Sequence, residues 1–204
     1  MTTVPVTTPP GIDPRLVVLV SGNGSNLQAI LDGCASGELG AQVVAVISDQ
    51  PEAFGLQRAS RANVPAIARP KAKTQDRVTY DTGLAELIAS FDPDWIVLAG
   101  WMRLLSSNLL DRFPNMVINL HPALPGTFPG THAIERAFEA HLRGEIEHTG
   151  VMVHLVPDEG VDSGPVLAEE IVAIEANDTL ETLEAKVHSV EHRLLVKTLH
   201  SLCV

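Results

Sequence analysis

The chain has 204 residues, of which 45% are hydrophobic and 19% are charged, as is typical of one globular domain of ordinary composition. Its formal net charge of -11, without a basic stripe in the sequence, argues against a nucleic-acid partner. The two cysteines, Cys34 and Cys203, do not form a CxxC pair, so neither a disulfide framework nor a zinc-cysteine site is expected.

The chain begins with a segment that has no features of a folded element. Residues 1–14, MTTVPVTTPPGIDP, lack the basic start and apolar core of a secretory signal. We expect a flexible tail over 1–14, followed by a single domain over 15–204. No apolar run approaches the ~20 residues of a membrane span. We therefore expect no membrane partner and a cytoplasmic location.

From residue 15 onward, short apolar runs alternate with segments of helical periodicity. The apolar runs predict strands over 15–20, 41–49, 64–70, 94–100 and 116–121. Helical spacing predicts helices within 21–37, 53–63, 76–91 and 106–113. This alternation favours an α/β fold, in which an open, mostly parallel, twisted sheet of Rossmann-like type has helices on both faces.

After residue 121 the pattern changes. We predict a loop rich in proline and glycine over 122–132 and a helix over 133–145. Two strands follow, over 150–156 and 165–174, joined by a turn-rich loop, and the last element is a long helix over 178–202. The two strands are expected to be antiparallel. Asp178 and Glu181 resemble a capping box at the start of the last helix.

The sequence GNGSN, residues 22–26, follows a strand and opens a helix, where backbone N–H groups and the helix dipole attract anions. A tight turn that needs glycine is the simpler explanation. A dinucleotide site is a second, because Gly22 and Gly24 match part of the GxGxxG fingerprint and Asp49 follows the next strand. However, Leu27 stands where the third glycine would be. The serine and asparagine of the loop add side-chain donors, which suit a single phosphate better than the pyrophosphate of a dinucleotide.

Polar side chains also mark the end of the fifth strand. Asn119 and His121 are two residues apart, so they point to the same side of a strand that Pro122 ends. Ligands of open α/β sheets bind outside the carboxyl ends of the strands, which makes His121 a catalytic candidate. In the turn-rich loop between the strands predicted over 150–156 and 165–174, Asp162 is flanked by Val161 and a serine-glycine pair. This position fits a turn residue as well as a functional one.

The remaining histidines have simpler explanations. His188 and His192 lie four residues apart on the last helix with Glu191 between them, but the order HSVEH is not the zinc-protease pattern HExxH. Helical packing or a polar contact with Glu191 is favoured over a metal. His154 alternates within a predicted strand and is interpreted as a core or covering residue.

Four segments, taken together, resemble one enzyme family. VLVSGNGSNLQAI, VLAGWMRLLS, VINLHPALPGTFPGTHAI and DEGVDSGPVLAEE are similar, in this order, to the phosphoribosylglycinamide formyltransferase family of folate-dependent formyltransferases. The resemblance implies formyl transfer from 10-formyltetrahydrofolate, as co-substrate, to the amine of glycinamide ribonucleotide in purine biosynthesis. It also implies a phosphate-binding N-terminal half and a folate-binding C-terminal half, without a metal.

The resemblance implies roles for individual residues. The glycine loop and the last helix would hold the phosphate and ribose of the substrate, and the segment after the fourth strand would hold the pterin. The substrate set is Gly24, Ser25, Asn26 and Glu191; the folate set is Arg77, Met102, Arg103, Leu104, Leu105 and Asn119; the catalytic set is Asn119, His121 and Asp162.

These residue types suit the chemistry. Attack of an amine on a formyl carbon creates an oxyanion, which the amide of Asn119 and a protonated His121 would stabilise. His121 would then protonate the departing nitrogen of the folate. We expect the carboxylate of Asp162 to raise the pKa of His121 above its ordinary value.

Other functions remain open from the sequence. A formyltetrahydrofolate hydrolase shares the catalytic residues but would carry an extra N-terminal domain, and a transfer-RNA formyltransferase would carry a C-terminal RNA-binding domain. A nucleotide-binding module without chemistry would leave Asn119 and His121 unexplained. We expect small-molecule partners only, and either a monomer or a homodimer.

Overall fold

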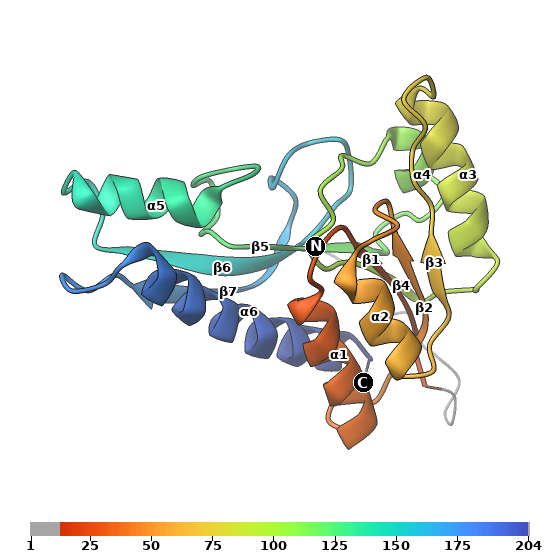
Figure 1. Cartoon of the computed structure of the whole chain (residues 1–204), viewed down its shortest axis with the longest axis horizontal. Helices are drawn as coiled ribbons and strands as arrows, with labels where there is room; N and C mark the ends of the chain where they lie inside the picture. Colours follow the sequence, from red (N-terminus) through yellow and green to blue (C-terminus); the bar gives the residue numbers. More distant parts are fainter. Residues whose placement is uncertain (1–12, 204) are drawn as a thin grey trace.

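The computed structural model describes residues 13–203, so the predicted tail lies almost wholly outside the described residues. Its seven strands form one sheet in the order β3-β2-β1-β4-β5-β6-β7 (Figure 1). The strands are β1 Arg15–Val20, β2 Gln42–Ser48, β3 Ala66–Ala68, β4 Trp95–Leu98, β5 Val117–His121, β6 His148–Leu155 and β7 Val166–Ala173. The helices are α1 Ser25–Ser36, α2 Phe54–Arg61, α3 Arg77–Ala89, α4 Ser107–Leu110, α5 Ala133–Leu142 and α6 Leu180–Cys203.

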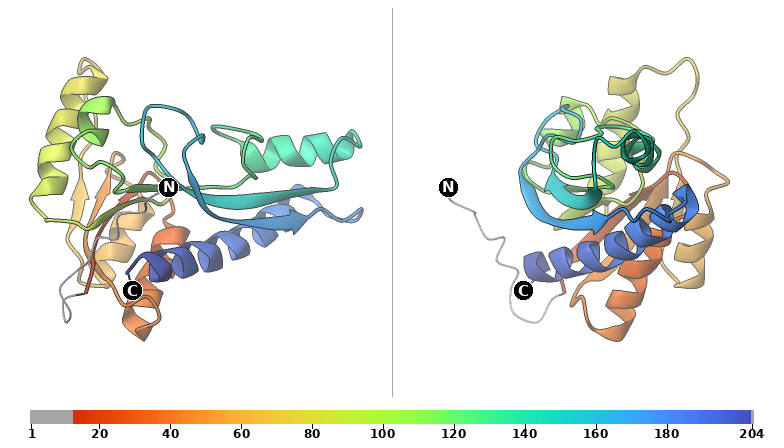
Figure 2. Two further views of the ribbon diagram at one scale, coloured as in Figure 1. Left: turned by 180° about the vertical axis from the view of Figure 1, so that it is seen from behind. Right: turned by 90° about the vertical axis from the view of Figure 1, so that its left-hand side faces the viewer.

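The predicted fold class is confirmed. Strands β1 to β5 pair in parallel, whereas β5 with β6 and β6 with β7 pair antiparallel. Each predicted element is present, with bounds that differ by a few residues at most. Figures 1 and 2 show α6 running along β6 and β7 toward α1, which agrees with the packing of α6 against these three elements.

Strand β1 shows why the sheet needs helices on both faces. All its residues from Leu16 to Val20 are fully buried. Leu16, Val18 and Val20 join one apolar cluster with α1 and α6, whereas Val17 and Leu19 join a second cluster with α3 and α4. A continuous apolar run is therefore stable here because both of its faces are covered.

The start of α6 corrects one prediction. Asp178 and Glu181 do not form the capping box. Thr179 does so with Thr182: each backbone N–H donates to the other's hydroxyl oxygen, at 2.9 Å and 3.3 Å. Asp178 instead accepts from Lys186 at 2.7 Å, which with other hydrogen bonds lowers the pKa of that carboxyl to about 2. The helix therefore begins one residue later than the acidic pair suggests.

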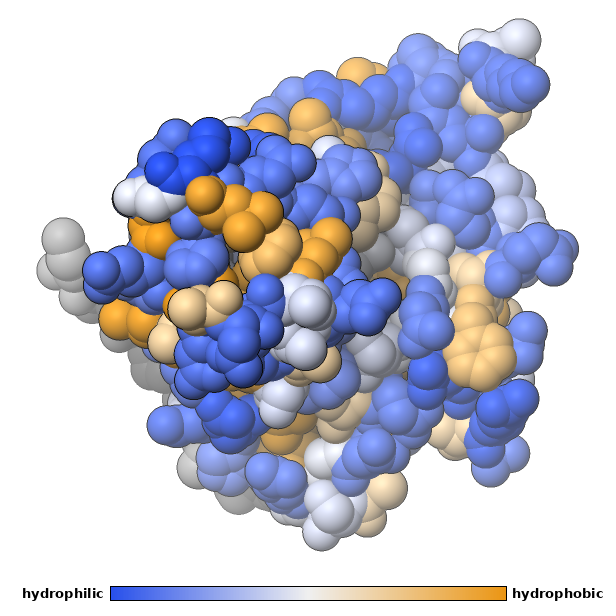
Figure 3. Space-filling view, turned by 60° about the vertical axis from the view of Figure 1, so that its left-hand side comes forward, coloured by the Kyte–Doolittle hydropathy of each residue, from blue (hydrophilic) through white to orange (hydrophobic). Residues whose placement is uncertain are grey.

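The strand order places a topological switch point at β1 and β4, because the chain leaves β1 toward β2 on one side and returns to β4 on the other. In such sheets a crevice opens at the carboxyl ends of the strands. The face of the molecule that Figure 3 presents is largely hydrophilic, with hydrophobic residues gathered in places. No helix within residues 13–203 has both the length and the apolar character to cross a membrane.

Candidate active site

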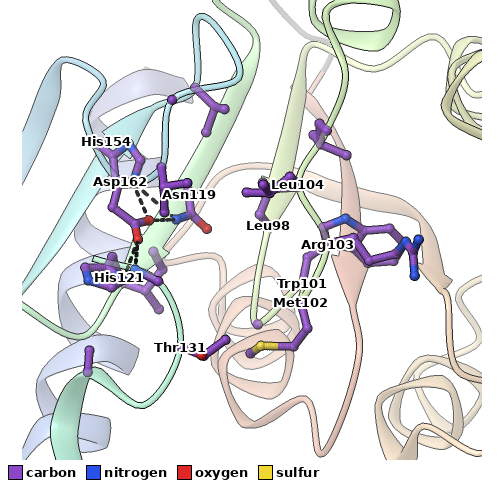
Figure 4. A pocket seen from close by; sticks show the side chains of 18 of the residues that line it. Leu98, Trp101, Met102, Arg103, Leu104, Asn119, His121, Thr131, His154 and Asp162 are labelled. Atoms are coloured by element: carbon purple, nitrogen blue, oxygen red, sulfur yellow. Dashed lines mark hydrogen bonds and ion pairs between the residues drawn. The ribbon is translucent and has the colours of Figure 1, made fainter. Parts of the chain in front are cut away.

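A cavity of about 590 Å³ lies at the carboxyl ends of β4 and β5. Its walls come from segments that are far apart in the sequence, namely Gly100–Leu105, Asn119–Pro122, Gly130–Ala133 and Asp158–Asp162, with His154 and Val156 from the end of β6. Figure 4 shows the polar side chains of Asn119, His121, His154 and Asp162 gathered on one wall, facing apolar side chains such as Leu98 and Leu104. A mostly apolar pocket with a few convergent polar groups is typical of a small-molecule site.

The structure brings together the three predicted catalytic residues. The Asn119 amide Nδ2 donates to Asp162 Oδ1 at 3.0 Å, and His121 Nδ1 lies 3.3 Å from Asp162 Oδ2. The N–H of Gly130 also donates to Oδ2, at 2.8 Å. Asp162 has a φ of 49°, in the left-handed region that few non-glycine residues adopt. Its three partners hold it there, as is common where backbone strain accompanies function.

His121 is more deeply buried than the sequence suggests, and one prediction about it is wrong. Its side chain is 5% exposed. Burial disfavours the charged ring and lowers the pKa of His121 below its ordinary value, although the carboxylate of Asp162 and the carbonyl of Phe128 act in the opposite direction. The effect of Asp162 has the expected sign, but the cost of removing a charged ring from water is larger.

The two ring nitrogens of His121 nevertheless both face acceptors. Nε2 lies 3.1 Å from the carbonyl oxygen of Phe128, and Nδ1 faces the carboxylate of Asp162. Because a carbonyl oxygen and a carboxylate both only accept, the single proton of the neutral ring can serve only one of them, whereas the protonated ring donates to both. The pocket therefore offers an acceptor for the added proton of the imidazolium.

His154 is a site residue that the sequence reasoning missed. It is 2% exposed and pairs with Asn119 across the antiparallel β5–β6 ladder. Its Nδ1 lies 2.8 Å from the carbonyl oxygen of Leu155, so Nδ1 is the protonated nitrogen of the neutral ring. Nε2 can then accept from the Asn119 amide at 3.1 Å, and it lies 3.5 Å from Asp162 Oδ1. His154 thus orients the Asn119 amide, and it would pair with Asp162 only when its ring is protonated.

The loop that carries Asp162 is fixed by its own backbone. A Cβ at Gly164 would overlap the carbonyl oxygen of Leu155, so this position requires glycine. The Leu155 N–H donates to the carbonyl of Pro165 at 2.9 Å. Burial alone would raise the pKa of Asp162, but the nearby His154 ring, the hydrogen bond from the Gly130 N–H and the charge of His121 together hold it below its ordinary value. Asp162 is therefore a stable carboxylate.

The glycine loop closes onto a neighbouring helix. Gly24 caps α1 with a φ of 75°, and a Cβ there would lie 2.8 Å from the Cα of Gly55. Arg58 Nε and Nη2 both donate to Asn23 at 2.9 Å, through its carbonyl oxygen and Oδ1 respectively. Local geometry alone therefore requires glycine at position 24. Ser25 and Asn26 form the first turn of α1, where unpaired N–H groups attract anions.

The predicted substrate residues Asn26 and Glu191 are brought together from positions 165 residues apart. Asn26 Nδ2 lies 3.5 Å from Glu191 Oε2, which also lies 2.7 Å from His188 Nδ1. Among residues 13–203, Asn26 Oδ1 and His192 Nε2 are buried without a hydrogen-bond partner. This polar cluster lies beside the glycine loop and apart from the cavity lining.

The predicted folate residues differ in their exposure. Met102 and Leu104 are 67% and 51% exposed, and both line the cavity with Arg103, whereas Leu105 is 4% exposed and is also part of the second apolar cluster. Arg77 is not among the lining residues. It forms an ion pair with Glu159, whose other oxygen accepts the Ser107 N–H at 2.8 Å. Arg77 therefore reaches the rim of the cavity through Glu159.

The structure also bears on the alternatives. Asp49, the acid of the dinucleotide interpretation, is 5% exposed and accepts from the Ser21 hydroxyl at 2.7 Å, so it is buried inside the protein. Within the described part of the chain, no group of three or more histidine, cysteine, aspartate or glutamate side chains is arranged to hold a metal ion.

Comparison with known proteins gives the family. The formyl transferase family model matches residues 14–199, which is most of the chain. The chain belongs to the formyl transferase family. The family predicted from the four segments is thereby confirmed.

Named relatives within the family agree with one another. The chain is 46% identical to phosphoribosylglycinamide formyltransferase of Schizosaccharomyces pombe over 200 residues, covering 92% of this chain and 96% of the relative. It is 39% identical to the Escherichia coli protein of that name, covering 88% and 82%. Glycinamide ribonucleotide transformylase 1 from Symbiobacterium toebii, a crystal structure, superposes with a TM-score of 0.87 at 39% identity, covering 93% of this chain and 87% of that one.

Proposed function

We infer that this chain transfers the formyl group of 10-formyltetrahydrofolate to the amine of 5-phosphoribosylglycinamide, a step of de novo purine biosynthesis. A relative named phosphoribosylglycinamide formyltransferase matches 92% of the chain at 46% identity. The observation that carries the inference beyond the family is the convergence of an amide, an imidazole and a carboxylate on one wall of the cavity. A binding module without chemistry would not need this arrangement.

The two substrates would approach from different sides of the switch point. The cavity, with its apolar wall around Leu104, suits the flat pterin head of the folate. The first turn of α1 suits the phosphate of the ribonucleotide, and Glu191 its ribose hydroxyls. In this arrangement the substrate amine would enter beside Asn119 and His121, while Arg77 would approach the folate from the rim.

The reaction needs no covalent enzyme intermediate. The amine nitrogen attacks the formyl carbon, a C–N bond forms, and the carbonyl oxygen becomes an oxyanion that Asn119 and a protonated His121 stabilise. The bond between the formyl carbon and N10 of the folate then breaks, and His121 delivers a proton to N10. The attacking nitrogen loses a proton to solvent, which balances the proton given to N10, so the products are the formylated ribonucleotide and tetrahydrofolate.

One feature of Asn119 constrains this mechanism. Its amide carries two N–H bonds, and these are directed at Asp162 and His154. An oxyanion can therefore be bound only when one of these bonds is exchanged. The bond to His154 is the one more easily exchanged for the oxyanion. Protonation of His154 Nε2 would remove that acceptor, whereas Asp162 remains a carboxylate that accepts.

The test is an assay of formyl transfer with both substrates, following tetrahydrofolate and the formylated ribonucleotide. We expect stoichiometric transfer that His121→Ala abolishes. Formate instead of the formylated ribonucleotide would identify a formyltetrahydrofolate hydrolase, the alternative that shares the catalytic residues. A cytoplasmic location and the choice between monomer and homodimer remain predictions.

A further inference from the structure

We propose that Ser21 and Asp49 are positioning residues that hold the dipeptide Met102–Arg103 in the shape that binds the folate. The proposal rests on the assignment of the cavity to the folate and extends it to two residues that do not line the cavity. It also gives Asp49 a role other than the ribose contact of a dinucleotide site.

Ser21 connects three strand ends. It directly follows β1, and its N–H donates to the carbonyl of Gly100 at 3.0 Å. The Met102 N–H donates to its hydroxyl oxygen at 2.9 Å, and that hydroxyl lies 2.7 Å from Asp49 Oδ1. A backbone N–H can only donate, and the serine hydroxyl has a single proton. The proton must therefore point to Asp49, which fixes the direction of the chain of hydrogen bonds from Met102 through Ser21 to Asp49.

Asp49 also acts on the side chain of the next residue. It directly follows β2, is 5% exposed, and its Oδ2 lies 3.8 Å from Arg103 Nη1. The Arg103 guanidinium lies over the ring of Tyr80, 5.2 Å from its centroid. One buried carboxylate thus orients the backbone at Met102, through Ser21, and the guanidinium of Arg103 directly.

These polar contacts matter because packing fixes only the ends of the segment. Trp101 and Leu105 are buried in the second apolar cluster, whereas Met102 is 67% exposed and Leu104 is 51% exposed, so neither of these side chains is anchored in the core. A hydrogen bond that ends on a carboxylate is stronger than one between neutral groups, and each bond in a connected series restricts the geometry of the next. The shape of the cavity wall at Met102–Arg103 therefore depends on Ser21 and Asp49.

The decisive variant is Ser21→Ala, which removes the hydroxyl and leaves the backbone bond to Gly100 intact. We expect the KM for 10-formyltetrahydrofolate to rise about tenfold, as befits a lost bond to a charged group. The KM for the ribonucleotide should stay within about twofold. Ser21→Thr, which keeps the hydroxyl, should restore most of the folate affinity.

Ser48→Ala is the matched control. Ser48 is fully buried one residue before Asp49, and its hydroxyl oxygen accepts only the Gln50 N–H, at 3.1 Å. Its loss should lower thermal stability without changing the KM for the folate. If Ser21→Ala behaves like Ser48→Ala, or raises both KM values equally, the positioning role is refuted.

A variant of the cavity wall separates this failure from a failure of the site assignment. Leu104→Asp places a charge on the apolar wall but leaves Ser21 and Asp49 unchanged. If Leu104→Asp raises the folate KM and Ser21→Ala does not, only the positioning role is wrong. If neither variant changes the folate KM, the cavity does not hold the folate and the site assignment fails.

Discussion

Replacement of Asn119 by alanine tests the oxyanion chemistry most specifically. The change removes the amide that donates to Asp162 at 3.0 Å and to His154 at 3.1 Å. Loss of one oxyanion donor lowers kcat by about 10²–10³, equivalent to about 3–4 kcal/mol of transition-state stabilisation. Both KM values should change little, since the bond forms mainly in the transition state.

The same change also affects the folded state, and the structure bounds that effect. Asp162 keeps two partners, the Gly130 N–H at 2.8 Å and the His121 ring at 3.3 Å. The stability loss should therefore be about that of one hydrogen bond to a charged group, ~1.5–3 kcal/mol. A chain of this size then loses roughly 3–12 °C in Tm, so the kinetics remain measurable at 25 °C.

Steady-state formyl transfer, measured over a range of concentrations of each substrate, is the appropriate assay because it separates kcat from both KM values. Asn108→Ala, which removes an exposed amide from α4 outside the cavity, is the matched control and should transfer at the wild-type rate. A kcat for Asn119→Ala within about threefold of wild type would remove the amide from the mechanism. An effect confined to KM would show that Asn119 binds substrate without stabilising the transition state.

Three further variants test other parts of the account. His154→Phe should lower kcat about tenfold with little change in KM, because the Asn119 amide loses an orienting partner; an unchanged kcat makes His154 a packing residue. Asn26→Leu should raise the KM for the ribonucleotide about tenfold or more and leave that for the folate unchanged, and the reverse result would show that the glycine loop holds the other ligand. The hydrogen bond to Glu191 raises the pKa of His188, so it stabilises the folded chain fully below the unfolded pKa of about 6.5 and loses this effect as pH rises through the folded pKa. The stability difference between wild type and His188→Gln, measured by denaturant unfolding, should shrink over that range, and a difference independent of pH would contradict the pairing.

The elements of this fold were predictable because their patterns are local. A run such as Leu16–Val20 is wholly apolar, and it needs two covered faces wherever it lies in a sheet. The period of two also predicts that Asn119 and His121 lie on the same side of β5. Both inferences use only neighbours in the sequence.

What was missed depends on contacts across the chain. His154 becomes a site residue only through its ladder register opposite Asn119, which no local pattern reveals. The direction of the His121 pKa depends on burial at the end of β5, so a nearby carboxylate alone predicted it wrongly. The pairing of Arg77 with Glu159 likewise joins residues 82 positions apart.

The claim that Asn119, His121 and Asp162 act as one unit is tested most directly by NMR titration of His121 in wild type and in Asp162→Asn. The account predicts a pKa below the ordinary value of about 6.5 in the wild type, because burial dominates. It predicts a still lower pKa in Asp162→Asn, because the opposing carboxylate charge is removed while the shape is kept. Equal pKa values in the two proteins would contradict the account, since Asp162 would then have no influence on the proton that His121 delivers.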